Sequence, residues 1–337
     1  MALNSTTLIV GDLHAKANNI ETVDKVLTQC KKLALKCTRT VFMGDQVDTK
    51  GVIQSAVARL FVKHFQQWPG RVIMLVGNHD KDNVQGSTRY HSLEFLKLLK
   101  NVSIIESPSL DREFKELFLP YMTDETLARQ VDILRTYGHL YNRIFIHNST
   151  MGAVYGNGRG VQSNVNLQNI QCPIIAGHIH LHQTVGNVTY VGTPYTTSFG
   201  ESDQEKHVAL MDNHSGYLEY VKLEGIPQHR TVRIEVADQD DLNNLRIMAR
   251  KDDLVRVVIT KPHNLNLDTS VLKDRAAKII IQNKRENLRL VQEEIAQVSS
   301  SVLHTTTDAI DKSNVDSINK ENLHTKNKDI IKEVQDE

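Results

Sequence analysis

Gly11-Asp12-Leu13-His14 follows the apolar run Leu8-Ile9-Val10, so an expected buried strand ends in acidic and imidazole side chains. Four more segments of this form follow along the chain: Gly44-Asp45-Gln46-Val47-Asp48 after 41–43, Gly77-Asn78-His79-Asp80 after 72–76, His147 after 144–146, and Gly177-His178-Ile179-His180 after 174–176. Ligands of α/β proteins bind at the carboxyl ends of strands, where the loops converge. We therefore expect these polar side chains to lie together at one edge of a sheet.

The spacing of apolar residues predicts the elements between these segments. Short β-branched runs predict strands over 7–10, 39–43, 72–76, 143–146 and 173–176, and helical spacing predicts helices over 17–36, 52–67, 88–100 and 124–137. From residue 184 the pattern changes to hairpins, with strands over 184–191, 207–211 and 217–223. Alternating strands and helices favour the α/β fold class, a sandwich with covered sheets.

A break at Gly225-Ile226-Pro227 divides the chain. We expect a main domain over 1–225 and a small α/β domain over 226–268, in which 230–260 has the pattern strand, helix, strand. The remainder, 269–337, is expected to be a helical and partly flexible tail, with a long helical pattern over 269–298. Between residues 225 and 290 the chain has 13 Lys and Arg against 9 Asp and Glu, so this region is locally basic.

The composition excludes several classes of protein. Lys plus Arg and Asp plus Glu are equal at 40 each, so a global basic field cannot hold nucleic acid, although a local patch can. No apolar run approaches the roughly 18 residues of a membrane span, and 1–7 shows no secretory signal. The three cysteines, Cys30, Cys37 and Cys172, form no close pair, which favours a reducing setting. We expect a cytoplasmic protein without membrane contact.

The polar segments together favour a metal centre. Taken singly, an Asp at a strand end can cap a helix, Gly-Asn-His-Asp can form a turn, and His147 can be structural. Taken together, carboxylates, neutral imidazoles and one amide suit divalent ions such as Mn²⁺, Fe²⁺ or Zn²⁺. Cysteine is absent from every segment, which argues against a structural zinc site. About seven ligands are too many for one ion and enough for two that share a bridging carboxylate.

The series GDLH, GDQVD, GNHD, His147 and GHIH resembles the calcineurin-like metallophosphoesterases over about residues 7–225. The resemblance implies a β-sandwich flanked by helices and two divalent metal ions, with Mn²⁺ the expected ion. It places Asp12, His14 and His180 on the first ion, Asn78, His147 and His178 on the second, and Asp45 between them. His79 would face the substrate phosphate as a catalytic group, and Asp80 would orient either His79 or a loop amide. Asp48 would act near the metals or cap the following helix.

Within this superfamily the chain is similar to SbcD-type DNA nuclease subunits, especially the compact phage recombination nuclease subunit. The stretch 188–201, Val-Thr-Tyr-Val-Gly-Thr-Pro-Tyr-Thr-Thr-Ser-Phe-Gly-Glu, resembles the strand and loop after the last metal motif of those proteins, and the basic appendage matches their DNA-capping domain. The resemblance implies an exonuclease and endonuclease that acts on DNA ends in recombination, repair or replication. It also implies a homodimer and an SMC-like, SbcC-type ATPase partner.

Two other functions stay open. Another calcineurin-like phosphoesterase, a nucleotide phosphodiesterase or a phosphomonoesterase, would carry the same metal ligands. The protein-phosphatase branch is disfavoured because it continues Gly-Asn-His with Glu, whereas this chain has Asp80. A metal-binding scaffold without catalysis would lack a ligand, but every expected position is filled.

Three further segments each allow two interpretations. The glycine-rich segment 152–160 lacks a following Lys-Ser/Thr, so it is either a substrate loop at the rim, with Arg159 or Tyr155 near DNA, or a solvent loop. Basic residues of the appendage either contact DNA phosphates or are solvated charges; they are Arg246, Arg250, Lys251, Arg256 and Lys261. An apolar stripe either docks the ATPase or packs on the chain itself; it consists of Leu288, Val291, Ile295 and Val298.

Overall fold

The computed structural model describes residues 5–82, 90–202, 204–234, 240, 252–259 and 278–283. The chain divides into two compact units. The first comprises Met1–Arg230 with Asp252–Leu254, and the second comprises Thr231–Lys251 with Val255–Glu337. Most residues after 234 lie outside the described part, so the expected division at 225 and 268 stays a prediction.

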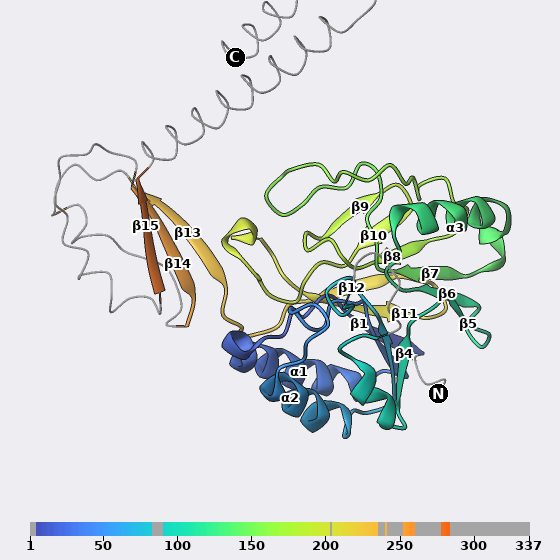
Figure 1. Ribbon diagram of the computed structural model, residues 1–337, viewed down its shortest axis with the longest axis horizontal. Coiled ribbons are helices and arrows are strands. Elements are labelled where there is room, and N and C mark those ends of the chain that lie inside the picture. Colours follow the sequence, from blue (N-terminus) through green and yellow to red (C-terminus); the bar gives the residue numbers. More distant parts are fainter. Residues whose placement is uncertain are drawn as a thin grey trace, which may run out of the picture. The chain divides into compact units, whose positions relative to one another are not determined.

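The first unit contains two six-stranded mixed sheets (Figure 1). One has the strand order β12-β11-β1-β2-β3-β4, and the other has the order β5-β6-β7-β8-β10-β9. The strands of the first sheet are β1 (Thr6–Val10), β2 (Arg39–Phe42), β3 (Arg71–Leu75), β4 (Val102–Ile105), β11 (Val208–Asp212) and β12 (Leu218–Val221). Those of the second are β5 (Ser109–Asp111), β6 (Glu116–Leu119), β7 (Arg143–Ile146), β8 (Ile174–Ala176), β9 (Gln183–Val185) and β10 (Val188–Tyr190).

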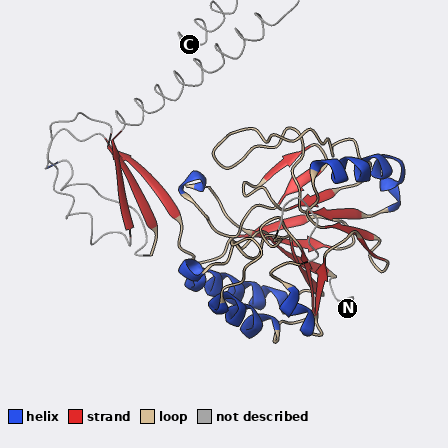
Figure 2. Ribbon diagram, in the orientation of Figure 1, coloured by secondary structure: helices blue, strands red, loops and turns tan. Residues whose placement is uncertain are grey.

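Helices cover the outer face of each sheet (Figure 2). The helices α1 (Ile20–Ala34) and α2 (Ser55–Phe65) share one apolar core with the first sheet, and α3 (Asp124–Tyr137) shares another with the second sheet. A third core lies between the sheets and includes stacked Phe118 and Phe145, whose ring centroids are 4.9 Å apart. The α/β sandwich flanked by helices, predicted from the sequence, is confirmed.

Alternation along the strands explains why both faces of each sheet are buried. In β1, Leu8 and Val10 belong to the core under the helices, whereas Ile9 belongs to the core between the sheets. Successive side chains of a strand point to opposite faces. A strand covered on both sides therefore consists of a continuous apolar run, such as Leu8-Ile9-Val10.

Parallel pairing brings the polar segments to one edge. In the first sheet β1, β2, β3 and β4 pair in parallel, and in the second β6, β7, β8 and β10 do so. The residues that follow β1, β2 and β3 therefore emerge side by side, as do those that follow β7 and β8. The loops of the metal motifs are these strand-end segments.

Short elements differ from the prediction. Within the expected helix over 88–100 the described residues form only a 3₁₀ helix, Glu94–Leu98, because Leu93 and Leu96 bury their side chains at a spacing of three and the backbone becomes extended at Leu99. The strands β4, β5 and β6 were not predicted. They have only three or four residues each, and a Ser, Asp or Glu interrupts or borders the apolar residues of each one, so no long apolar run marks them.

The second unit contains a three-stranded sheet in the order β13-β14-β15. Its strands are β13 (His229–Ile234), β14 (Leu254–Ile259) and β15 (Lys278–Asn283). The prediction of one long helical pattern over 269–298 is wrong at β15, where three consecutive isoleucines favour a strand because of their branched β-carbons. The two strands expected within 230–260 are present, and the helix expected between them lies outside the described residues. Within the described part of the chain, no helix is both long and apolar enough to cross a membrane.

Candidate metal centre

The first unit brings all seven candidate ligands to the edge where its parallel strands end. Asp12 and His14 follow β1, Asp45 follows β2, and Asn78 follows β3. His147 follows β7, while His178 and His180 follow β8. Both sheets therefore contribute to one site.

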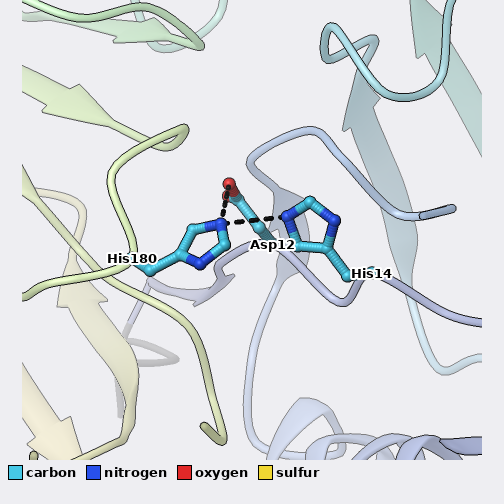
Figure 3. A group of neighbouring side chains, drawn as sticks. All are labelled: Asp12, His14 and His180. Atoms are coloured by element: carbon cyan, nitrogen blue, oxygen red, sulfur yellow. Dashed lines mark hydrogen bonds and ion pairs between the residues drawn. The ribbon is translucent and has the colours of Figure 1, made fainter. Parts of the chain in front are cut away.

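Asp12, His14 and His180 form a first group (Figure 3). The Nε2 atoms of His14 and His180 lie 2.9 Å apart, and His180 Nε2 lies 3.9 Å from Asp12 Oδ2. Figure 3 shows the two rings facing each other beside the Asp12 carboxylate. Two imidazole nitrogens and a carboxylate that converge in this way suit a divalent cation.

Asn78, His147 and His178 form a second group. His147 Nε2 lies 3.3 Å from Asn78 Oδ1, and His178 Nδ1 lies 2.8 Å from the same oxygen. On its other side, His147 donates from Nδ1 to the carbonyl oxygen of Met43 at 2.6 Å. That bond fixes the proton on Nδ1 and leaves the Nε2 lone pair for a cation.

Asp45 lies between the two groups. Its Oδ2 is 3.8 Å from His14 Nε2 and 3.3 Å from His147 Nε2, while its Oδ1 accepts the backbone N–H of His79 at 2.7 Å. Burial alone would raise the pKa of Asp45, but His147 and His14 lower it far below its usual value. An ionised carboxylate in this place can bridge two cations.

The charges of the site depend on one another. Burial would lower the pKa of His147, yet the carboxylates of Asp45 and Asp12 raise it to about 9. Burial and the neighbouring His147 lower the pKa of His178 to about 3. Buried carboxylates and imidazoles crowded together need a compensating charge, and a divalent cation supplies it.

The backbone is strained at three of these residues. His14, Asp45 and His178 have φ angles of 43°, 49° and 75°, in the left-handed region. For a residue that carries a side chain, this conformation costs about 1–2 kcal/mol. Such strain persists where the surrounding structure imposes it, and it clusters at functional sites.

Glycines of the motifs leave room for the site. A Cβ on Gly44, whose φ is 111°, would lie 2.2 Å from His147 Nδ1. A Cβ on Gly77 would lie 2.1 Å from Asp45 Oδ1. Side chains at these two positions would collide with the candidate ligands themselves.

Charged residues lie behind the first group. Asp48 Oδ1 lies 3.1 Å from His14 Nδ1, and its Oδ2 is 3.0 Å from Lys16 Nζ. Of the two roles predicted for Asp48, this contact matches the one near the metals; helix capping is wrong, because α2 begins at Ser55 with Gln54 as its N-cap.

Glu201 and Lys206 occupy the corresponding place behind His180. His180 donates from Nδ1 to Glu201 Oε1 at 2.8 Å, and Glu201 Oε2 is 2.8 Å from Lys206 Nζ. Sequence reasoning missed Lys16, Glu201 and Lys206 as site residues. The only signal for Glu201 was its place at the end of the 188–201 stretch.

His79 and Asp80 have different surroundings. His79 lines the cavity described below and donates from Nδ1 to the carbonyl oxygen of Asp48 at 2.8 Å, which leaves Nε2 for a substrate. Asp80 is fully buried and accepts the backbone N–H groups of Gly77 at 2.9 Å and Val47 at 3.1 Å. Of the two roles predicted for Asp80, these contacts match the loop-amide role.

A cavity of about 540 Å³ lies over both groups. Its lining includes Tyr155, Gly156 and Asn157 from the glycine-rich segment, and Thr197, Ser198, Gly200 and Glu201 from the turn next to that segment. The segment is a tight hairpin: Tyr155 N–H donates to the carbonyl oxygen of Arg159 at 2.8 Å, and Gln204 Nε2 donates to that of Gly156 at 2.7 Å. The segment therefore lies at the rim, where Tyr155 rather than Arg159 lines the cavity.

Apart from Arg159 and Tyr155, the expected DNA and partner contacts belong to the second unit or lie outside the described residues. Arg256 lies in β14, and its Nη2 donates to Thr231 Oγ1 at 3.2 Å. The others lie outside the described residues: Arg246, Arg250, Lys251 and Lys261 for DNA, and Leu288, Val291, Ile295 and Val298 for the partner. These roles stay predictions.

Comparison with known proteins agrees with this geometry. The sequence model of the family described as "Calcineurin-like phosphoesterase" matches residues 5–187, a range that includes all seven candidate ligands from Asp12 to His180. The chain belongs to the calcineurin-like phosphoesterase family. It is 26% identical over 267 residues to a protein of Invertebrate iridescent virus 6 named "Putative phosphoesterase 244L", a match that covers 76% of this chain and 93% of that protein.

Calcineurin-like phosphoesterases use divalent metal ions, and the residues present fit such ions. Neither group contains a thiolate. The ligand atoms of Asp12, His14 and His180 lie within 4.8 Å of one another, and so do those of Asp45, His147 and His178. This member of the family is therefore a metal-dependent enzyme that hydrolyses phosphoesters.

Proposed function

We propose that this phosphoesterase is a DNA nuclease that cleaves phosphodiester bonds at DNA ends as an exonuclease and endonuclease. The observation that carries the proposal is the cavity of about 540 Å³ over both groups, with Tyr155 and the turn at 197–201 among the segments that line it. An aromatic side chain at such a rim can stack on a base of a single strand, whatever the base. The SbcD-like stretch 188–201 ends at this same rim.

The charge of the rim favours a phosphodiester over a phosphomonoester. Among the described residues that line the cavity, Lys16 is the one Lys or Arg, and its Nζ is 3.0 Å from Asp48 Oδ2. A phosphomonoester dianion needs more positive charge around it than a phosphodiester, which carries a single charge. The phosphates on either side of the cleaved bond would then be held elsewhere, and the basic residues predicted for the second unit are the candidates.

The mechanism follows from the positions of the side chains. When bound, two divalent cations withdraw charge from the phosphate and lower the pKa of the water that they bind toward neutral, so that hydroxide is available to attack the phosphorus. Asp12, His14 and His180 would hold one, Asn78, His147 and His178 the other, and Asp45 both. His79 then donates a proton from Nε2 to the leaving 3′ oxygen. Asp80 fixes the loops that carry Asp45 and His79 through the amides of Val47 and Gly77.

The wider setting of this activity rests on the resemblance to SbcD-type subunits. We propose Mn²⁺ as the ion, a homodimer as the assembly, and an SMC-like ATPase as the partner. The ATPase would dock on the stripe of Leu288, Val291, Ile295 and Val298. A chain truncated after 283, which keeps β15 and removes the stripe, would then lose the ATPase and keep metal-dependent cleavage.

The test is digestion of end-labelled duplex DNA by the full chain in Mn²⁺, with Asp45→Ala as the control. Progressive loss of label that is absent in the variant supports the nuclease. The second candidate, a nucleotide phosphodiesterase, is favoured by the same Tyr155, which can also stack on the base of a mononucleotide. Hydrolysis of bis(p-nitrophenyl) phosphate without DNA digestion would favour that candidate, and preference for p-nitrophenyl phosphate would contradict both.

A further inference from the structure

The histidines of the two groups differ in what lies behind them. In the first group, His180 Nδ1 donates to Glu201 at 2.8 Å, and His14 Nδ1 lies 3.1 Å from Asp48. In the second group, His147 Nδ1 donates to a neutral backbone carbonyl, that of Met43. His178 Nδ1 lies against Asn78, which is itself a candidate ligand. Within the described residues, carboxylates therefore lie behind the histidines of the first group alone.

Each of these carboxylates is held by a lysine. Lys206 Nζ lies 2.8 Å from Glu201 Oε2 and also donates to the carbonyl oxygen of His180 at 2.9 Å, so it fixes both members of the pair. Lys16 Nζ lies 3.0 Å from Asp48 Oδ2. Two arms of contacts therefore lead to the same candidate cation site, each from a lysine through a carboxylate to a histidine. One arm is Lys206, Glu201 and His180, and the other is Lys16, Asp48 and His14.

The arm through Glu201 is the more rigid of the two. The Glu201 side chain is 5% exposed, and its Oε2 also accepts from Thr193 Oγ1 at 3.3 Å and from the backbone N–H of Thr197 at 3.2 Å. The Asp48 side chain is 31% exposed, and His14 Nδ1 makes no aligned hydrogen bond to it. The arm through Asp48 is therefore expected to contribute less.

We propose that Glu201 with Lys206, and to a lesser degree Asp48 with Lys16, make the Asp12–His14–His180 site the tighter of two unequal cation sites, so that it fills first. A carboxylate that accepts the Nδ1–H of a ligating histidine fixes the ring and increases the electron density on Nε2. Loss of such an outer partner costs about 10–100-fold in metal affinity. A backbone carbonyl, the partner of His147, carries no full charge and increases the density on Nε2 less.

The proposal rests on the two cation sites of the proposed function, but it does not require DNA to be the substrate. The experiment is calorimetric titration of the metal-free full chain with Mn²⁺ alone. We expect two dissociation constants in the wild type. Asn78→Ala is expected to keep the tighter one, and His180→Ala the weaker one.

Glu201→Gln is the decisive variant because it keeps the shape and removes the charge. We expect it to weaken the tighter constant about 10–100-fold and to leave the weaker one unchanged. Asp48→Asn is expected to weaken the tighter constant less. Since Glu201→Gln leaves Lys206 buried without its carboxylate, Glu201→Gln/Lys206→Met is a second variant in which both charges are removed, and the same weakening is expected.

Two results would overturn the inference: equal constants in the wild type, or a tighter constant that stays unchanged in Glu201→Gln and in the double variant. If the wild type has the expected pair of constants but digests no DNA, the nuclease proposal fails and the inference stands. If DNA is digested and the two constants are equal, the inference fails and the nuclease proposal stands.

Discussion

His147 Nδ1, after the end of β7, lies 2.6 Å from the carbonyl oxygen of Met43, after the end of β2. One hydrogen bond therefore joins the two sheets at the edge that holds the candidate ligands. Because His147 is fully buried, this bond also sets the direction of its Nε2. The packing of the sheets and the geometry of the metal centre depend on the same contact.

Gly44→Ala tests that dependence. Its Cβ would lie 2.2 Å from His147 Nδ1, so either the ring or the end of β2 must move. Overpacking of this kind costs about 1–3 kcal/mol of folding free energy. We expect a lower urea midpoint together with weaker Mn²⁺ binding. Gly160→Ala is the control, because a Cβ there meets nothing within 4 Å; equal effects of the two changes would contradict the argument.

A buried ion-pair network joins the sheets at the other ends of these strands. Arg39, the first residue of β2, pairs with Glu116, the first residue of β6, and Arg143 Nη1 lies 3.2 Å from Glu116 Oε1. Glu116→Ala would leave two buried guanidinium groups without this carboxylate. We expect a loss of about 3–5 kcal/mol in the free energy of unfolding.

The control for Glu116 is an exposed pair. Asp132 and Arg135 lie 3.1 Å apart on α3, with side chains 74% and 48% exposed. Asp132→Ala is expected to change stability by no more than about 0.5 kcal/mol. Urea unfolding of both variants separates the two cases. If Glu116→Ala costs as little as Asp132→Ala, the network does not hold the sheets together.

His79→Ala separates catalysis from metal binding. Its ring lines the cavity, but its hydrogen bond goes to the carbonyl oxygen of Asp48 and not to a candidate ligand. We expect unchanged Mn²⁺ constants and a turnover lowered about 10²–10⁴-fold, the effect of losing a general acid. Full activity of the variant on both DNA and bis(p-nitrophenyl) phosphate would remove His79 from the mechanism.

The sequence predicted the parts of the fold and site that local patterns encode. Leu8-Ile9-Val10 is apolar at every position because both faces of β1 are covered, and that run marked the strand as well as the ligands after it. The site roles of Glu201 and Lys206 were not predicted, because their partner, His180, is more than twenty residues earlier and the contact depends on the turn at 197–201. The strand β15 was not predicted, because its three isoleucines lie within a longer helical pattern; in the structure their strand propensity decides the local conformation.

The thiols give a prediction on chemical reactivity. Burial raises the pKa of Cys30 to about 12, and that of Cys172 to about 12, while it raises the pKa of half-buried Cys37 to about 11. Since the thiolate is the reactive form, all three resist iodoacetamide at pH 8 in the folded chain. Mass spectrometry of a time course is expected to show Cys37 modified first, and all three modified rapidly in urea. Early modification of Cys30 would contradict the packing of α1 against the first sheet.

Removal of the metal is expected to lower the melting temperature. Asp12 and Asp45 place two buried carboxylates at one site, and burial together with the charge of Asp45 raises the pKa of Asp12. A cation that binds only the folded chain stabilises it by about 2.7 kcal/mol at a hundredfold excess over its dissociation constant. At about 2–4 °C per kcal/mol for a chain of a few hundred residues, we expect the melting temperature to be about 5–11 °C higher in Mn²⁺ than in EDTA.

Asp45→Asn is the matched variant for this shift. Asn keeps the size of the side chain, accepts the N–H of His79 through its amide oxygen, and tolerates the left-handed backbone at this position. It lacks the charge that both candidate sites share, so most of the Mn²⁺-dependent rise should vanish. Asp45 Oδ2 lies between His14 Nε2 and His147 Nε2, where it can contact both ions. A rise as large as in the wild type would mean that the ions bind without the Asp45 carboxylate, and it would contradict the bridging role.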